Sequence, residues 1–239
     1  MTQIVVIAGN AYNIGAETAR LFAAQGAQVV LIDHLLVTQS AMRFMKADLT
    51  SVMAIQDVAR NCESELSHVN VLFNVAGSNV IRQSFEHTTE DTWSTMIARN
   101  LSSAFWCSKY FLPLLKKAGG ASIINHASID GYLGNPSIAA YSAAKGGVLP
   151  LTHVMAHDLA KYNIRVNSIS TGGIRPTPAP GSRADEARIA VTPSARMGTP
   201  QDVAPVAMFL ASAGASYVNG ANIVVDGGRT VTTHGCYTD

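Results

Sequence analysis

Short apolar runs rich in Val and Ile recur along this chain, and segments long enough to form helices lie between them. The runs are mostly continuous rather than alternating, which is typical of strands covered on both faces of a sheet. They are Ile4–Ala8, Val29–Ile32, Val71–Val75, Ser122–Ile124, Ile164–Ile169 and Ile223–Val225, with Arg43–Leu49 as a shorter candidate. Strand–helix alternation predicts a doubly wound α/β sandwich of three layers around a mainly parallel, seven-stranded sheet.

Three segments have the length and composition of helices. Ile14–Gln25 is rich in Ala and stops at Gly26, a residue that commonly ends helices. Thr89–Leu115 and Ala139–Lys161 are longer, and Pro150 inside the second should remove a backbone hydrogen bond and kink it. Ligands of such sheets bind beyond the carboxyl ends of the strands, so the residues after each apolar run are the candidates for a site.

Length and composition argue against several classes of protein. The 239 residues show no internal repeat and no linker, so we expect one domain over residues 1–239. The balance of 17 Lys and Arg against 16 Asp and Glu disfavours a nucleic-acid partner, and no apolar stretch is long enough to span a membrane. Cys62, Cys107 and Cys236 have neither disulfide nor metal spacing, which favours a reducing cytoplasm and no metal site.

A turn over residues 8–15, with glycines at Gly9 and Gly15, joins the first strand to the first helix. Backbone amides at the N-terminus of a helix can bind a pyrophosphate. Asn13 stands where a further glycine is usual, and we expect it to tolerate the positive φ angle of such a turn. A glycine pair alone is a weak signal, so the prediction depends on the order of strand, turn and helix.

The second strand ends at Asp33, 24 residues after Gly9. An acid at about this distance accepts hydrogen bonds from the adenosine ribose and repels a 2′-phosphate. Two unit charges about 4 Å apart cost about 4 kcal/mol at an effective dielectric of 20, and residues 10–13 hold no Lys or Arg to offset this. NAD is therefore expected rather than NADP; the alternative is that Asp33 only caps the strand. Asp48 and Leu49 could contact the adenine, or Asp48 could serve as a helix N-terminal acid.

Tyr141 and Lys145 are four residues apart in a predicted helix and so share one face of it. The phenol of Tyr has a pKa of about 10, and lowering it by about 3 units requires about 4 kcal/mol. An ammonium about 4 Å away supplies that much at an effective dielectric of 20, whereas burial raises the pKa of a phenol. Ser128, 13 residues before Tyr141, ends a strand and can donate to a substrate oxygen.

Further polar residues fall near the predicted strand ends and helices. Asn74–Gly77 ends one strand with small residues that permit a cofactor to approach, and Asn100 occupies a helix interior, where Asn is unfavourable unless its side chain has a role. His126, two residues before Ser128, is expected on the opposite side of its strand. His153 and His157 have the spacing of a metal pair but lack a third ligand, so packing or solvation is the favoured interpretation.

Taken together, these residues resemble the short-chain dehydrogenase/reductase family, in its subgroup of single-domain oxidoreductases. The resemblance runs from the Gly9 turn to the ending Asp226-Gly227-Gly228 and implies a Rossmann-type fold, NAD as cofactor and a secondary alcohol or ketone as substrate. It implies that Tyr141 is the general acid/base, that Lys145 depresses its pKa and binds the nicotinamide ribose, and that Ser128 polarises the substrate oxygen. Asn100 would position a water on a proton relay from Lys145.

The resemblance also implies which residues bind the ligands, and that the chain forms a homodimer or homotetramer. The implied cofactor-binding residues are Gly9, Asn13, Ile14, Gly15, Asp33, Asp48, Leu49, Asn74, Ala76, Gly77, Tyr141, Lys145 and Ile174. Ser128, Asp130 and Tyr141 would bind the substrate. The chain departs from the family pattern at Ala8, Asn13, Thr171 and Pro176, which concerns how the cofactor is held rather than proton transfer.

Two other functions stay open. A non-catalytic module that senses NADH would have lost Tyr141, Lys145 or Ser128, and all three are present. A 3-oxoacyl-thioester reductase, or a dehydratase or epimerase, could use the same fold. The arginines in and after the loop that begins at Gly172 would suit an acyl-carrier partner or a polar, hydroxylated or anionic substrate, although a solvated rim is the favoured interpretation. They are Arg175, Arg183, Arg188 and Arg196.

Overall fold

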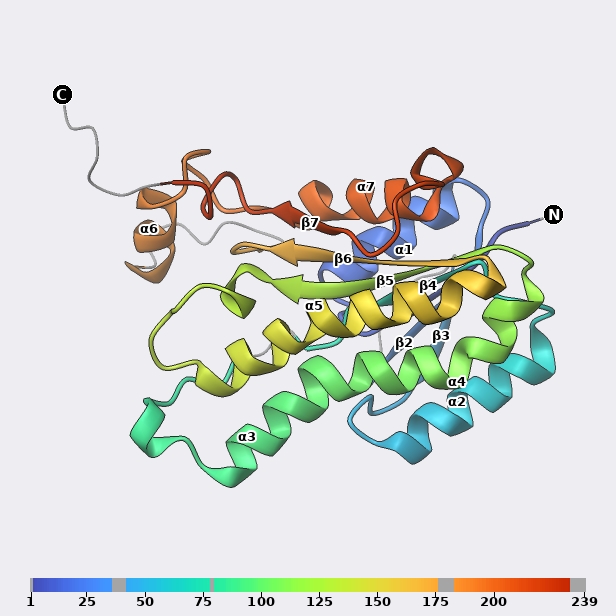
Figure 1. The fold of residues 1–239 in the computed structure, drawn as a ribbon, viewed down its shortest axis with the longest axis horizontal. Coiled ribbons are helices and arrows are strands. Elements are labelled where there is room, and N and C mark those ends of the chain that lie inside the picture. The colour runs from blue at the N-terminus through green and yellow to red at the C-terminus, as the bar shows by residue number, and fades with distance from the viewer. Residues whose placement is uncertain (1, 36–41, 78–79, 176–182, 233–239) are drawn as a thin grey trace.

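A single sheet of seven parallel strands runs through the computed structural model, which describes residues 2–35, 42–77, 80–175 and 183–232 (Figure 1). The strand order is β3-β2-β1-β4-β5-β6-β7, so the direction of winding reverses between β1 and β4. The strands are β1 (Ile4–Ala8), β2 (Gln28–Asp33), β3 (Arg43–Lys46), β4 (Val71–Asn74), β5 (Ala121–Ser128), β6 (Ile164–Thr171) and β7 (Asn222–Val225). The predicted doubly wound parallel sheet is confirmed.

Helices cover both faces of the sheet. α1 and α7 pack together on one face, while α2, α4 and α5 cover the other (Figure 1). The helices are α1 (Ile14–Ala24), α2 (Val52–Glu65), α3 (Glu90–Ile97), α4 (Ser103–Lys117), α5 (Ala139–Leu159), α6 (Arg183–Ala190) and α7 (Pro200–Ala211). None of the described helices is both long and apolar enough to cross a bilayer.

The predicted helix over Thr89–Leu115 is interrupted in the structure. α3 ends at Ile97, a π-helical turn occupies Ala98–Ser102, and α4 follows. Single π-helical turns inside α-helices commonly mark functional positions, and this turn has Asn100 at its centre. By contrast, α5 continues as one helix through Pro150.

Two apolar cores hold the layers together, one on each face of the sheet. Fully buried residues such as Phe111 and Leu114 of α4 pack on one face, and Phe22 of α1 packs on the other. Burying one such side chain contributes about 1.5–3 kcal/mol, so the sheet is a rigid support for whatever follows its strands. The carboxyl ends of β1, β4 and β5 therefore place their loops at one fixed edge.

Candidate active site

Two cavities open at the carboxyl edge of the sheet and share Asn10. The N-terminal cavity, of about 230 Å³, is lined by Gly9, Asn10, Tyr12, Asp33, His34, Asp48, Leu49, Thr50, Ala76, Gly77 and Arg99. The central cavity, of about 480 Å³, lies between the first turn, the ends of β5 and β6, and the start of α5. Asn13, Ile14, His126, Ser128, Asp130, Tyr141 and Ile174 are among the residues that line it.

The first turn is packed so tightly that side chains are excluded from it. A Cβ at Gly9 would lie 2.5 Å from the Cα of Ala76, and one at Gly15 would lie 2.3 Å from the carbonyl oxygen of Gly9. Positive φ angles occur at Gly9 (101°) and Asn10 (57°). Asn13 has a φ of −141°, so the left-handed conformation expected there is wrong. The turn bends three residues earlier, and Asn13 instead precedes α1.

Asp33 holds this turn from the end of β2. Its carboxylate is buried; Oδ2 accepts a hydrogen bond from the backbone N–H of Ala11 at 2.9 Å, and Oδ1 accepts one from Leu35 at 3.2 Å. The ring of His34 lies 2.7 Å from Oδ1. Asp33 therefore stabilises the turn in addition to lining the N-terminal cavity.

Asp48 and Arg99 lie on other walls of the N-terminal cavity. Asp48 Oδ1 accepts hydrogen bonds from the backbone and hydroxyl of Thr50 at 2.9 and 2.7 Å, and the backbone contact is the main reason that the pKa of Asp48 lies below its usual value. Arg99 comes from the π-helical turn, far away in sequence. Sequence reasoning missed Arg99 because only the fold brings that turn to this cavity.

Ser128, Tyr141 and Lys145 come together where β5 meets α5. Ser128 ends β5 and donates a hydrogen bond to the phenol oxygen of Tyr141, and both line the central cavity. Lys145 lies one helical turn beyond Tyr141 and is fully buried. Its ammonium donates a 2.8 Å hydrogen bond to the backbone carbonyl of His126. The three side chains predicted to form the reactive centre are thus neighbours.

Burial controls the protonation of this centre. It raises the pKa of Tyr141 to about 12, partly offset by the hydrogen bond from Ser128, and lowers the pKa of Lys145 to about 7. Both shifts favour the neutral form, because charge is poorly solvated in a buried site. In the protein alone, burial therefore outweighs the lowering of the phenol pKa that the spacing of Tyr141 and Lys145 suggested.

His126 faces the central cavity, as Ser128 does, and the expectation that it faces the other side is wrong. Residues two apart in a strand point to the same face, so the two side chains follow one another along β5. His126 Nε2 lies 3.0 Å from the hydroxyl of Thr171 on β6, and Nδ1 has no hydrogen-bond partner among the described residues. Burial holds the pKa of His126 well below its usual value, so the ring is neutral.

Asn74 and Asn100 lie behind the cavities, where both line a small space between β4 and α4. Asn74 Nδ2 donates to Asn125 Oδ1 and Ser108 Oγ, each at 2.9 Å, and so ties β4 to β5 and α4. Asn100 Nδ2 donates to the carbonyl of Met96 at 3.0 Å. Its Oδ1 has no partner in the described residues and lies against Gly77, whose Cβ would come within 2.3 Å of it.

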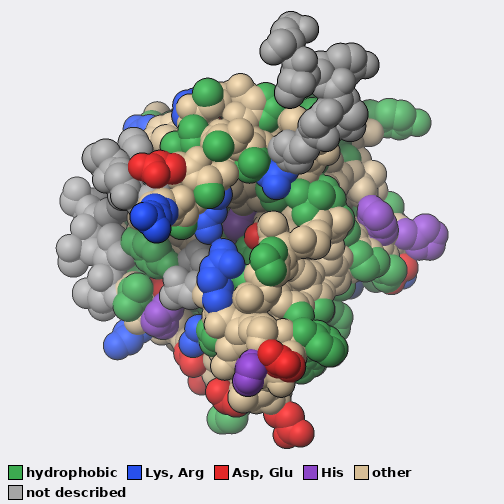
Figure 2. Space-filling view, turned by 90° about the vertical axis from the view of Figure 1, so that its left-hand side faces the viewer, with side chains coloured by type: hydrophobic (Ala, Val, Ile, Leu, Met, Phe, Trp, Pro, Cys, Tyr) green, Lys and Arg blue, Asp and Glu red, His purple; other side chains and the backbone are tan. Residues whose placement is uncertain are grey.

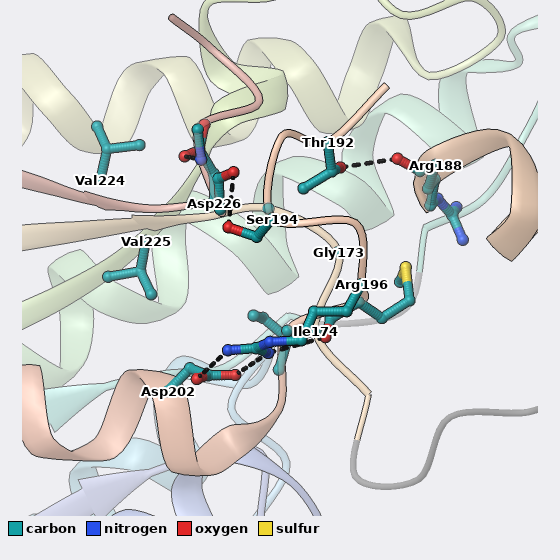
Figure 3. Close-up of a pocket in the computed structure, with 15 residues that line it drawn as sticks. Gly173, Ile174, Arg188, Thr192, Ser194, Arg196, Asp202, Val224, Val225 and Asp226 are labelled. Carbon is teal, nitrogen blue, oxygen red and sulfur yellow. Dashed lines mark hydrogen bonds and ion pairs between the residues drawn. The ribbon is translucent and has the colours of Figure 1, made fainter. Parts of the chain in front are cut away.

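The loop after β6 separates the central cavity from a third cavity of about 300 Å³ (Figure 3). Arg196 lies in this third cavity, where its guanidinium makes two contacts of 2.7 and 2.8 Å with Asp202 (Figure 3). Asp202 in turn accepts from the backbone of Thr199 and caps α7. Arg196 therefore forms a structural ion pair with Asp202. Pro176, one of the positions at which the chain departs from the family pattern, lies outside the described residues.

Comparisons with known proteins agree with this fold. Residues 8–230 match the model of a family described as enoyl-(acyl carrier protein) reductase. The chain is 34% identical to meso-2,3-butanediol dehydrogenase of Serratia marcescens over 96% of this chain and 95% of that protein. It is 31% identical to an NADP-dependent (R)-specific alcohol dehydrogenase of Lentilactobacillus kefiri, over 95% and 96% of the two chains.

A solved structure is also similar over most of both chains. The short-chain dehydrogenase of Leptospira borgpetersenii with bound NAD+ superposes with a TM-score of 0.88 at 30% identity, covering 96% of this chain and 93% of that one. The matched family model, the similar dehydrogenases and the solved structure all point to the same family. The chain belongs to the short-chain dehydrogenase/reductase family.

Proposed function

We propose that this protein is an NAD(H)-dependent oxidoreductase that interconverts a secondary alcohol and a ketone. The observation that carries the proposal is the convergence of Ser128 and Tyr141 on one cavity that also reaches Asn13, Ile14 and Ile174. An acid/base pair and a turn able to bind phosphate thus share a single space. The relatives named as a meso-2,3-butanediol dehydrogenase and an (R)-specific alcohol dehydrogenase support the same class of reaction.

The residues present fit a dinucleotide. Gly9 and Asn10 of the turn before α1 line the N-terminal cavity, where backbone amides near the start of a helix can bind a phosphate group. Asn10 and Asn13 carry buried amide atoms that have no hydrogen-bond partner among the described residues, and both line the central cavity. When bound, the nicotinamide supplies the acceptor or donor of the hydride. Asp33, Asp48 and Leu49 would hold the adenosine end, and Ile174 the nicotinamide end.

The chain's own residues would handle the proton. Ser128 holds the substrate oxygen by a hydrogen bond, and Tyr141 takes the hydroxyl proton during oxidation or donates one during reduction. The pKa of about 12 keeps the phenol of Tyr141 protonated in the protein alone, so it is ready for reduction. Oxidation requires the phenolate, which the charge of a protonated Lys145 would stabilise. Asn100, whose Oδ1 is available to accept a hydrogen bond, would hold a water that returns the proton to solvent.

The preference for NAD is proposed from Asp33, which lines the N-terminal cavity and would repel a 2′-phosphate. The guanidinium of Arg99 and the ring of His34 also line this cavity, so the choice of cofactor depends on the balance between Arg99 and the carboxylates of Asp33 and Asp48. Cytoplasmic location stays a prediction from the cysteines, and assembly into a homodimer or homotetramer stays one from the family resemblance.

An assay of nicotinamide absorbance at 340 nm tests the proposal. The purified protein is given secondary alcohols with NAD+ or NADP+, and ketones or a 3-oxoacyl thioester with NADH or NADPH. We expect turnover of an alcohol–ketone pair with NAD(H) at a kcat/KM at least ten times that with NADP(H). Turnover of the thioester alone would favour the acyl reductase, and cofactor binding without turnover of any compound would favour the sensing module.

A further inference from the structure

The central cavity is lined by several basic side chains. Four arginines line it: Arg82, Arg175, Arg188 and Arg229. Basic side chains gather around a hollow on the face shown in Figure 2. Among the described residues, Asp130 and Asp226 are the acidic ones that line the same cavity. The walls therefore carry more positive than negative charge.

Two of these arginines are held by one buried acid. Asp185 of α6, only 4% exposed, lies 2.8 Å from Arg175 and 3.5 Å from Arg188. A single carboxylate cannot neutralise two guanidinium groups, so this cluster keeps a net positive charge beside the cavity. The 2.8 Å contact with Asp185 orients Arg175, which lowers the entropy cost of binding an anion there.

The acids of the cavity are also engaged. Asp226 accepts hydrogen bonds from the backbone N–H groups of Gly228 and Thr230 at 2.8 and 2.7 Å. Asp130, next to Ser128, accepts a hydrogen bond from the side chain of Asn135. Arg82 differs from all of these residues, because it makes no hydrogen bond or ion pair within the part of the chain that the structure describes. Its exposed guanidinium lines the cavity with its donors available.

We propose that the substrate is a hydroxycarboxylate, with its alcohol at Ser128 and Tyr141 and its carboxylate against Arg82 and the Arg175–Arg188 cluster. This inference rests on the proposed function. In the oxidation, the carbinol C–H bond breaks and its hydride passes to NAD+. The hydroxyl proton passes to the phenolate of Tyr141 and the carbon–oxygen double bond forms, while the carboxylate stays unchanged.

A single negative charge fits better than a phosphate dianion. Asp185 offsets one of the four arginine charges, and Asp130 and Asp226 lie close enough to repel a second negative charge on the substrate. A guanidinium also matches the planar carboxylate through two parallel hydrogen bonds. Preferred turnover of a phosphorylated alcohol or of a neutral polyol would therefore contradict the proposal.

Isosteric pairs isolate the charge of the substrate. 3-Hydroxybutanoate is compared with 3-hydroxybutanamide, and 4-hydroxycyclohexanecarboxylate with its carboxamide. We expect kcat/KM for the carboxylate to exceed that for the carboxamide at least tenfold in one pair, with the preference falling as salt rises. Equal values, or faster turnover of a phosphorylated alcohol, would overturn the inference and leave an alcohol dehydrogenase in place.

Arg82→Gln tests the residue itself. We expect the carboxylate-to-carboxamide preference to fall at least fivefold, through a higher KM for the carboxylate, and Arg82→Lys to restore part of it because the charge returns. Arg60→Gln is the matched control, since Arg60 is exposed on α2 and pairs with Asp57 away from the cavity. An unchanged preference in Arg82→Gln would contradict the assignment.

Calorimetry with NADH-saturated protein gives a result even without turnover. The same hydroxycarboxylates should bind the wild-type protein more tightly than their carboxamides, and Arg82→Gln should remove that difference. Absence of carboxylate binding would overturn the inference. By contrast, carboxylate binding without oxidation by either cofactor would count against the proposed reaction alone, so the two failures are distinguishable.

Discussion

Nζ of Lys145 donates a 2.8 Å hydrogen bond to the backbone carbonyl of His126, and this contact joins α5 to β5 two residues before the strand ends at Ser128. It fixes the distance between the helix that carries Tyr141 and the strand that carries Ser128. It also places a lysine, fully buried and with a pKa lowered to about 7, at the centre of the molecule. Lys145 therefore both joins the two elements that carry Tyr141 and Ser128 and pays the desolvation penalty of a buried amine.

Lys145→Met should change how stability depends on pH. In the unfolded chain a lysine keeps a pKa of about 10.4, so from pH 7 to 10 the unfolded state binds a proton that the folded state lacks. Stability of the wild type therefore rises with pH in this window, by up to about 1.4 kcal/mol per pH unit from this group. Urea unfolding at pH 7, 8 and 9 should show that Lys145→Met lacks this rise.

Lys117→Met is the control for that experiment, because Lys117 is exposed on α4 and pairs with Glu63 at 3.0 Å. Its pH dependence should parallel that of the wild type. Parallel curves for all three proteins would mean that Lys145 titrates at the same pH in the folded and unfolded chains.

Gly9→Ala and Gly26→Ala separate the strain of a positive φ angle from steric exclusion. Gly26 has a φ of +80° and nothing within 4 Å of an added Cβ, so its replacement should cost about 1–2 kcal/mol and leave NADH binding unchanged. Gly9 has a φ of +101° and its Cβ would lie 2.5 Å from the Cα of Ala76. We expect that replacement to cost roughly 2–5 kcal/mol and to weaken NADH binding at least tenfold.

Thermal unfolding and fluorescence titration with NADH measure both effects. Similar losses in the two variants would show that the first turn tolerates a methyl group. That outcome would remove the argument that the turn is shaped for the close approach of a phosphate.

Asp33→Ala should alter both the turn and the choice of cofactor. The buried N–H of Ala11 would lose its acceptor, which costs about 1–3 kcal/mol of stability. Loss of the carboxylate removes the repulsion of a 2′-phosphate, so the ratio of NADH to NADPH affinity should fall at least tenfold. Titrations of the variant with both cofactors measure this ratio, with Asp57→Ala on the exposed face of α2 as the control. An unmoved ratio would place cofactor selection at Arg99 or His34 instead.

The sheet and the proximity of Ser128, Tyr141 and Lys145 could be predicted because their signals are local. Buried parallel strands require continuous apolar runs, and chemistry at the carboxyl edge requires polar residues directly after them, as at Asp33 and Ser128. Tyr141 and Lys145 are separated by one helical turn, so their proximity follows from their spacing alone. These features need no knowledge of which strands are neighbours.

Other features depended on packing between distant segments. Arg82, Arg99 and Arg229 reach the cavities only through the fold, and no local pattern sets them apart from arginines on a solvated rim. The π-helical turn at Asn100 lies within a sequence that reads as one long helix. The prediction of a left-handed conformation at Asn13 was wrong because the turn has its left-handed asparagine at Asn10 instead.

Tyr141→Phe tests the central claim most directly, since it removes one hydroxyl from a ring that packs against Ile138 and Ala140 and leaves the shape of the cavity intact. Turnover of an alcohol substrate should fall by about two to four orders of magnitude, which is the usual contribution of a general acid/base. The affinity for NADH should stay within about threefold of that of the wild type. Unchanged turnover in a variant that still binds NADH would contradict the role of Tyr141 in proton transfer.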